Sequence, residues 1–107
     1  MRKPKVGLFL ISPARFQKIG EETPGGSYAQ RKEKEAAWMV RTASERFDPV
    51  FPGIIYTAED TRRAIRLFTG EGVDCVLAVY LSWAEDFALN RFLRDMPPIP
   101  VLYAWRL

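Results

Sequence analysis

The residues best suited to binding chemistry follow two long apolar runs of the chain. Arg15 and Gln17 come shortly after the run VGLFLI. Ser82 and Trp83 come directly after the run VDCVLAVYL. A guanidinium donates in a fork, an amide both donates and accepts, and an indole offers a flat apolar face, a mixture that suits a neutral polyol or sugar better than a phosphate. The residues expected to bind substrate are therefore Arg15, Gln17, Ser82 and Trp83.

A structural explanation competes with this one. Trp83 stands where a helix is expected to begin, and a large apolar residue there can fix the helix start by packing on the core. Arg15 lies in a long polar loop, where a guanidinium is commonly solvated. The residue types alone do not separate the two explanations.

Other chemistries lack the residues that they need. The first apolar run is followed by Ser12-Pro13-Ala14-Arg15 instead of a glycine-rich phosphate loop. The chain has no histidine and one cysteine, Cys75, which is expected to be a small buried hydrophobe. These counts exclude a disulfide framework, a Cys/His metal site and a Ser/His/Asp arrangement. Glu21-Glu22 are expected to be solvated and Glu85-Asp86 to cap a helix, so we expect no catalytic residue and no metal ligand in this chain.

Four apolar runs are expected to be the strands that position the candidate residues. Those at residues 6–11, 73–80 and 101–105 show no polar alternation, as is typical of parallel strands covered on both faces. The run at residues 50–55 contains Pro52-Gly53 and is expected at the sheet edge, because proline cannot donate to a central ladder.

Three helices are expected between these strands. One covers about residues 28–46, one follows Thr57 and ends before Gly70 and Gly72, and one covers about residues 84–95. Each begins with the spacing of a capping box: Ser27 with Gln30, Thr57 with Asp60, and Ser82 with Glu85.

The order βαβαβαβ, right-handed crossovers and the edge position of the second strand together predict the sheet order 2-1-3-4. This is an α/β fold, a flavodoxin-like open parallel sheet in three layers, truncated after the fourth strand, with residues 1–107 as a single domain. Ligands of such sheets bind at the carboxyl ends of the strands, near the switch point between the first and third strands. Arg15 and Ser82 would face each other there.

Composition and charge narrow the class of protein. Apolar residues make up 48% of the chain, which is enough for a core and excludes a disordered tail. A net charge of +3, from 16 basic and 13 acidic residues that are interspersed, does not favour nucleic acid. No signal peptide or membrane span is visible, so we expect a cytoplasmic protein without a membrane partner.

Three segments resemble the N-terminal domain of the L-fucose/L-arabinose isomerase family: VGLFLISPARFQKIGEE, VDCVLAVYLSWAEDFA and IPVLYAW. In that family the first strand is followed by a polar loop, often with a Gly-Glu pair, here Gly20-Glu21. The third strand ends in an aromatic-bearing turn, and the next strand is similar to IPVLLW. The loop departs from the family pattern at Pro13 and at Pro24-Gly25-Gly26, which leaves the identity of the sugar open.

The resemblance implies the substrate-recognition and assembly domain of an aldose–ketose isomerase. Such enzymes act by a metal-assisted cis-enediol or hydride-shift route, usually with Mn²⁺, and their metal ligands and catalytic carboxylates lie in later domains. The N-terminal domain of one subunit lines the active site of a neighbour through a loop residue and an aromatic residue, which correspond to Arg15 or Gln17 and to Trp83. The expected partners are the remaining domains, the neighbouring subunits of a homo-oligomer and the sugar substrate.

The fourth expected strand is followed only by Arg106 and Leu107, so we expect the N-terminal part of a longer multidomain chain. Its open apolar edge predicts self-association there or through an apolar face of the third helix, comprising Phe87, Leu89, Phe92 and Leu93. The alternative is a free-standing flavodoxin-like module that binds a protein or a small ligand.

Overall fold

The computed structural model describes residues 3–18, 20–21, 24, 26–82 and 87–105. In this part of the chain four parallel strands form one sheet in the order β2-β1-β3-β4, which confirms the predicted fold class and strand order. The strands are β1 (Lys5–Ile11), β2 (Asp48–Val50), β3 (Cys75–Tyr80) and β4 (Val101–Trp105). β1 lies between β2 and β3 and is buried beyond its first residue, which explains its unbroken apolar sequence.

The edge strand is shorter than predicted and lies earlier in the chain. β2 pairs with β1 over Asp48–Val50, and the prediction of a strand at residues 50–55 is therefore wrong in its extent. The chain rejoins the sheet at Ile55, which forms an isolated bridge to Ile11. Pro52-Gly53 accounts for the gap, because proline has no N–H to donate and Gly53 has φ of 100°.

The first two helices begin with the predicted reciprocal caps. α1 (Tyr28–Ala43) follows Ser27, whose hydroxyl accepts from the Gln30 backbone while the Gln30 side chain accepts from the Ser27 N–H. α2 (Ala58–Glu71) follows Thr57, which exchanges the same pair of bonds with Asp60. These caps satisfy N–H groups that have no partner inside the helix.

The helix ends differ from the predictions in detail. α1 ends at Ala43 instead of residue 46. α2 continues through Gly70 and ends at Glu71, and Gly72 caps it with φ of 63°, the left-handed conformation that favours glycine after a helix. α3 covers Phe87–Asp95, and its predicted cap by Glu85 lies outside the described residues.

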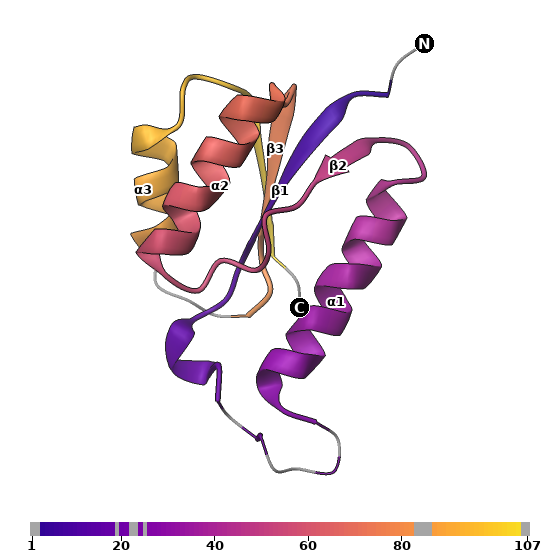
Figure 1. Cartoon of the computed structure of the whole chain (residues 1–107), viewed down its shortest axis with the longest axis vertical. Helices are drawn as coiled ribbons and strands as arrows, with labels where there is room; N and C mark the ends of the chain where they lie inside the picture. The colour runs from indigo at the N-terminus through magenta and orange to yellow at the C-terminus, as the bar shows by residue number, and fades with distance from the viewer. Residues whose placement is uncertain (1–2, 19, 22–23, 25, 83–86, 106–107) are drawn as a thin grey trace.

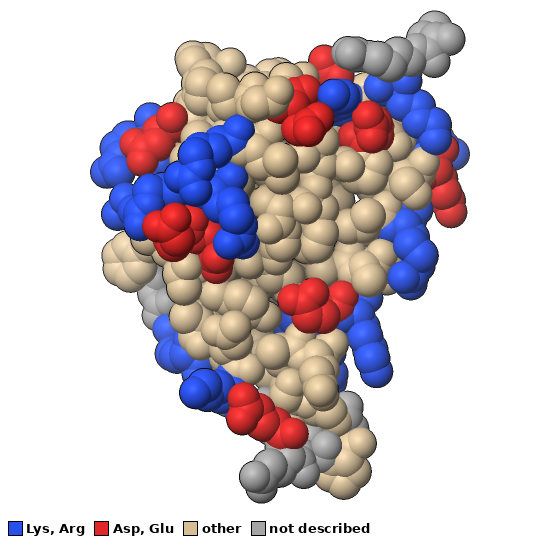
Figure 2. Space-filling model, in the orientation of Figure 1, with Lys and Arg blue, Asp and Glu red and all other residues tan. Residues whose placement is uncertain are grey.

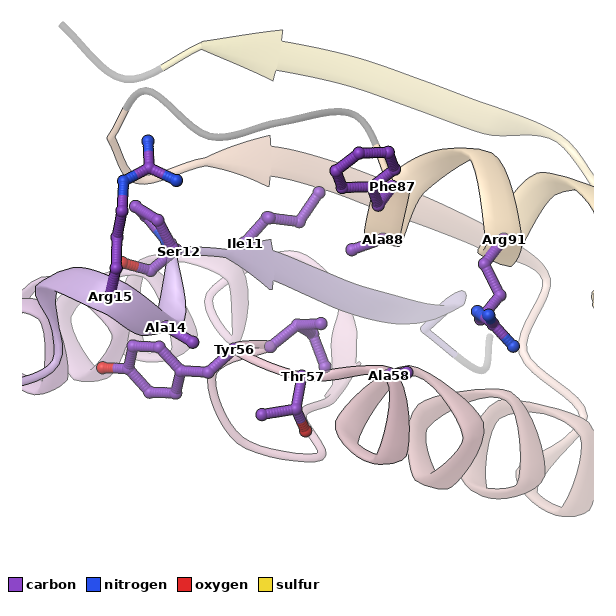
Figure 3. Close-up of a pocket in the computed structure, with 12 residues that line it drawn as sticks. Ile11, Ser12, Ala14, Arg15, Tyr56, Thr57, Ala58, Phe87, Ala88 and Arg91 are labelled. Carbon is purple, nitrogen blue, oxygen red and sulfur yellow. The ribbon is translucent and has the colours of Figure 1, made fainter.

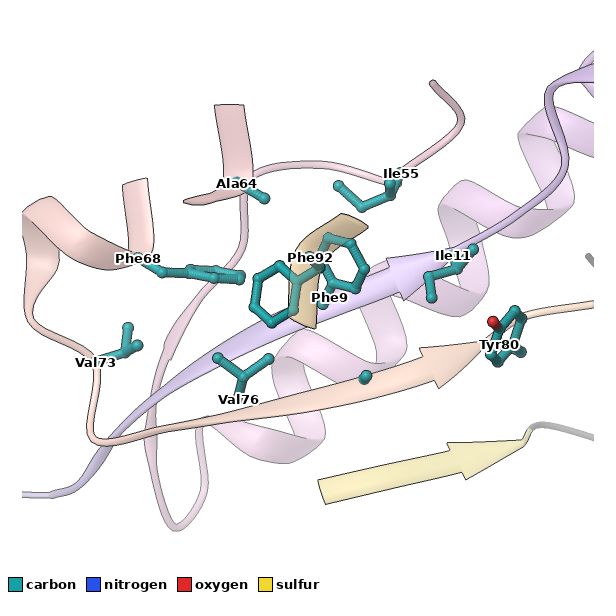
Figure 4. Packing of buried hydrophobic residues seen from close by; sticks show 10 residues of the cluster. Phe9, Ile11, Ile55, Ala64, Phe68, Val73, Val76, Tyr80 and Phe92 are labelled. Carbon is teal, nitrogen blue, oxygen red and sulfur yellow. The ribbon is translucent and has the colours of Figure 1, made fainter. Parts of the chain in front are cut away.

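The helices form two layers around the sheet. α1 covers one face, while α2 and α3 lie side by side on the other (Figure 1). On the α2/α3 face the rings of Phe9, Phe68 and Phe92 pack together, with ring centroids 4.4 Å apart for Phe9–Phe92 and 6.0 Å for Phe68–Phe92 (Figure 4). This burial corrects one expectation, because Phe92 belongs to the core and is not part of an exposed face of α3.

The α1 face of the sheet carries one helix, and a groove of about 440 Å³ lies beside it. Its apolar lining includes Leu8 and Leu77 from the sheet, Trp38 and Phe47 from α1 and the turn after it, and Leu102 from β4. We call it the α1-side groove. Cys75 also lines it and is half-buried, so this thiol is less enclosed than predicted. None of the described helices is long and apolar enough to span a membrane.

Candidate functional site

A cavity of about 330 Å³ opens at the carboxyl ends of the strands, on the α2/α3 side of the sheet (Figure 3). β1 and the turn after it supply Ile11, Ser12, Pro13, Ala14 and Arg15. The segment leading into α2 supplies Ile55, Tyr56, Thr57 and Ala58, and α3 supplies Phe87, Ala88 and Arg91. We call this the carboxyl-edge cavity. Its position is the one at which open parallel sheets bind their ligands.

Backbone hydrogen bonds fix the floor of the cavity. The Ile55 N–H donates to the Leu10 carbonyl at 2.8 Å, and the Ser12 N–H donates to the Ile55 carbonyl at 3.0 Å. The wall next to it is held by Asp60, whose carboxylate accepts from the Tyr56 N–H at 2.9 Å and from the Thr57 N–H at 3.0 Å. The α2 cap therefore also sets the shape of the site.

Two arginines stand at opposite ends of the cavity in Figure 3. Arg15 lies in a short 3₁₀ helix, Ala14–Phe16, and its guanidinium carbon is 4.9 Å from the centroid of the Phe16 ring. Arg91 lies on α3 and extends toward α2, with Phe87 one turn before it. Between these cations the lining is largely apolar and includes Phe87 and Ala88 (Figure 3).

A second polar group lies on the α1 side of the same edge. The Tyr28 hydroxyl bonds the Ser12 hydroxyl at 2.6 Å and also bonds the Ser82 hydroxyl. Beside it, Lys32 donates to the Leu81 carbonyl at 3.0 Å. We call Ser12, Tyr28 and Ser82 the hydroxyl cluster. It joins the ends of β1 and β3 to the first turn of α1, at the predicted switch point.

The four predicted binding residues therefore have different surroundings. Arg15 lines the carboxyl-edge cavity, whereas Gln17 is exposed and does not line it. Ser82 uses its hydroxyl in the hydroxyl cluster and is not among the residues that line the cavity. Trp83 lies outside the described residues. The structure brings Arg15 and Ser82 to the same edge of the sheet, but only Arg15 lines the cavity.

Sequence analysis did not single out Arg91, Phe87 or Tyr28 as site residues. A signal existed for the first two, because Phe87 and Arg91 are four residues apart and so share one face of α3. No comparable signal existed for Tyr28, whose hydroxyl partners are 16 and 54 residues away in the sequence.

Tyr56 contributes a buried hydroxyl next to this edge that makes no hydrogen bond to any described residue. Burial, with smaller contributions from Glu33, Tyr28 and Asp60, raises the pKa of the Tyr56 phenol to about 12. Burial disfavours the charged phenolate, and the nearby negative charges act in the same direction. Tyr56 is therefore a neutral group at physiological pH.

The described residues do not fit a metal site. No group of three or more His, Cys, Asp and Glu side chains among them is placed to hold a metal ion. We assign no step to a metal in this part of the chain.

Together the fold and the cavity define an α/β protein with a flavodoxin-like parallel sheet and a small cleft at its carboxyl edge. Comparisons with known protein families, with curated proteins and with solved structures found no match.

Proposed function

We propose that this chain is the N-terminal substrate-recognition and assembly domain of an aldose–ketose sugar isomerase of the L-fucose/L-arabinose isomerase type. The observation that carries the proposal is the carboxyl-edge cavity. Its volume of about 330 Å³ is at the small end of the range for ligand pockets, roughly 300–1,000 Å³, and suits one monosaccharide better than a nucleotide cofactor.

The chemistry of the cavity lining supports a polyhydroxylated ligand. Sugars present hydroxyl groups along their edges and C–H groups on their faces. Thr57 and Arg15 offer polar contacts, while Phe87 and Ala88 offer apolar ones. Sites for small molecules commonly combine an apolar lining with a few placed polar groups in this way.

The same residues support recognition without catalysis. Proton transfer between the carbons of a sugar needs a positioned acid or base, and none of the described residues that line the cavity is Asp, Glu or His. The proposal therefore places the catalytic groups and Mn²⁺ in other domains of the parent enzyme. This chain would bind and orient the sugar, and its surface would contact the remaining domains and the neighbouring subunits.

Binding of neutral sugars to the isolated chain tests the recognition role. We expect saturable binding of L-arabinose or L-fucose in calorimetry, with NMR shift changes confined to residues of the carboxyl-edge cavity. Arg15→Ala should weaken binding roughly tenfold, because it removes a charged hydrogen-bond donor. Gln17→Ala is the matched control, since Gln17 is exposed and does not line the cavity. If neither sugar binds, the recognition role is contradicted.

An activity assay tests the division of labour. The 107-residue chain with Mn²⁺ and L-fucose or L-arabinose should give no ketose above the background without protein. Measurable turnover would show that catalytic groups lie within this chain and would overturn that part of the proposal.

A second candidate function is a free-standing flavodoxin-like module that acts through protein contacts, and the α1-side groove favours it. The reading frame downstream of Leu107 separates the two candidates. Metal-binding carboxylates and a histidine encoded there would support the isomerase, whereas an immediate stop codon would support the free-standing module.

A further inference from the structure

We infer that the carboxyl-edge cavity prefers a sugar derivative with a terminal carboxylate or phosphate over the corresponding neutral sugar. The inference rests on the proposed function, because it concerns the ligand of the same cavity. It also revises the expectation of a neutral polyol, since the sequence indicated one arginine at this site and the structure places two there.

The described lining carries two guanidinium groups and no carboxylate. Arg15 and Arg91 each carry a guanidinium with five N–H groups and no acceptor. The described residues that line the cavity include no carboxylate to receive the O–H groups of a neutral sugar. A ligand rich in acceptors, such as one bearing a carboxylate or phosphate, complements such a lining better than one whose hydroxyls must also donate.

The acidic residues at the start of α2 do not neutralise the positive charge of the cavity lining, because their carboxylates already have other partners. Glu59 accepts from Arg62 at 2.8 Å. Asp60 accepts from two backbone N–H groups and pairs with Arg63 at 3.2 Å. Neither residue is among those that line the cavity.

Arg91 is the better anchor for the anionic group. It is half-buried, and its charge acts on Asp95 only at longer range, because that carboxylate is paired with the exposed Arg94 at 2.8 Å. Because Asp95 is already shared with Arg94, a ligand anion at the half-buried Arg91 would be stabilising. The Arg91 side chain extends from α3 toward α2 (Figure 3).

Calorimetry with matched ligands tests the inference at low salt. The ligands are L-arabinose, L-arabinonate, L-arabinose 5-phosphate and inorganic phosphate. We expect at least one of the two acidic derivatives to bind at least tenfold more tightly than L-arabinose, and inorganic phosphate to bind more weakly than that derivative. Arg91→Met should remove the preference, and Arg94→Met, the matched control on the same helix, should retain it.

Each other outcome has a definite meaning. Equal binding of neutral and acidic ligands, or a preference that survives in Arg91→Met, overturns the inference and leaves the proposed function standing. Inorganic phosphate binding as tightly as the sugar phosphate also overturns it, because the site would then recognise a bare anion. Binding of none of the ligands overturns the proposed function as well. Should Arg91→Met fail to fold by circular dichroism, Arg91→Gln replaces it, and Arg91→Lys should keep part of the preference.

Discussion

Two tyrosine hydroxyls at the carboxyl edge of the sheet have opposite surroundings. Tyr28 bridges two serines in the hydroxyl cluster, whereas the Tyr56 hydroxyl is buried and makes no hydrogen bond with the described residues. A satisfied buried hydroxyl adds to stability, and an unsatisfied one subtracts from it. Removing each hydroxyl should therefore have effects of opposite sign.

Tyr56→Phe should leave the protein as stable as the natural chain or more stable by about 1 kcal/mol, because it removes a buried group without a partner. The pKa of about 12 adds a pH dependence. Since the phenol of the unfolded chain ionises near pH 10, the free energy of unfolding should fall between about pH 10 and 12 and should not change through Tyr56 below that range. Chemical denaturation at several pH values measures this, and an equally steep fall in Tyr56→Phe would contradict it.

Tyr28→Phe should lower the free energy of unfolding by about 1–2 kcal/mol, because it leaves the buried Ser12 hydroxyl without its partner. A double-mutant cycle with Ser12→Ala isolates the bond. The double variant should be less destabilised than the sum of the two single variants, since no unpaired hydroxyl then remains at that position. Strict additivity would show that the two hydroxyls do not stabilise one another.

At the scale of elements, variants at the two ends of α2 can distinguish an effect on stability from an effect on ligand binding. Thr57→Ala removes the helix cap beside the cavity, and Gly72→Ala forces a left-handed conformation at the far end of the helix. Each should lower the free energy of unfolding by about 1 kcal/mol. Only Thr57→Ala should also weaken ligand binding, because Thr57 lines the cavity and Gly72 does not. Equal loss of binding in both variants would mean that binding follows stability alone.

Most of the fold followed from local signals in the sequence. Unbroken apolar runs indicated β1, β3 and β4, and two capping boxes indicated the starts of α1 and α2. The edge strand was misplaced because the apolar pattern at residues 50–55 reflects burial of Ile54 and Ile55, while Pro52-Gly53 interrupts their pairing. An apolar sequence pattern indicates which side chains are buried, and buried residues need not form continuous backbone pairs in a strand.

The site was harder to predict than the fold. The position of Arg15 after β1 indicated this residue, whereas no sequence signal was used to identify Arg91 on α3. The hydroxyl cluster joins three distant positions, and such contacts depend on how helices pack on the sheet, which no local pattern specifies. The positions of residues after the strands predicted that the site lies at the carboxyl edge of the sheet. Which side chains meet there depends on how the helices pack.

At the scale of the whole molecule, exposed apolar residues gather around β4. Trp38, Phe47 and Leu102 line the α1-side groove on one face, and Leu93 and Tyr103 lie together on the other. On the face seen in Figure 2, Lys and Arg gather toward the sides, with Asp and Glu among them, around a broad area of other residues. The described part of β4 pairs only with β3, so its other edge is open to a further strand.

We expect the chain to self-associate at high concentration through this edge. Leu102→Lys should shift sedimentation toward the monomer, because it places a charge on the β4 edge, where Leu102 is 64% exposed. Leu93→Lys, at a 53% exposed position on α3, tests the alternative surface. A stronger effect of Leu93→Lys would assign association to α3, and a monomer at all concentrations of the natural chain would contradict the prediction.

The bond between Ser12 and Tyr28 has a consequence for how this protein can be altered. The two residues flank the segment at residues 13–27, so the bond draws both ends of that segment to one point. A segment anchored in this way can change its length and sequence at little thermodynamic cost, since doubling a loop adds only about 0.6 kcal/mol of closure entropy. We therefore expect the segment between Ser12 and Tyr28 to accept insertions and substitutions, which would change ligand specificity on an unchanged sheet.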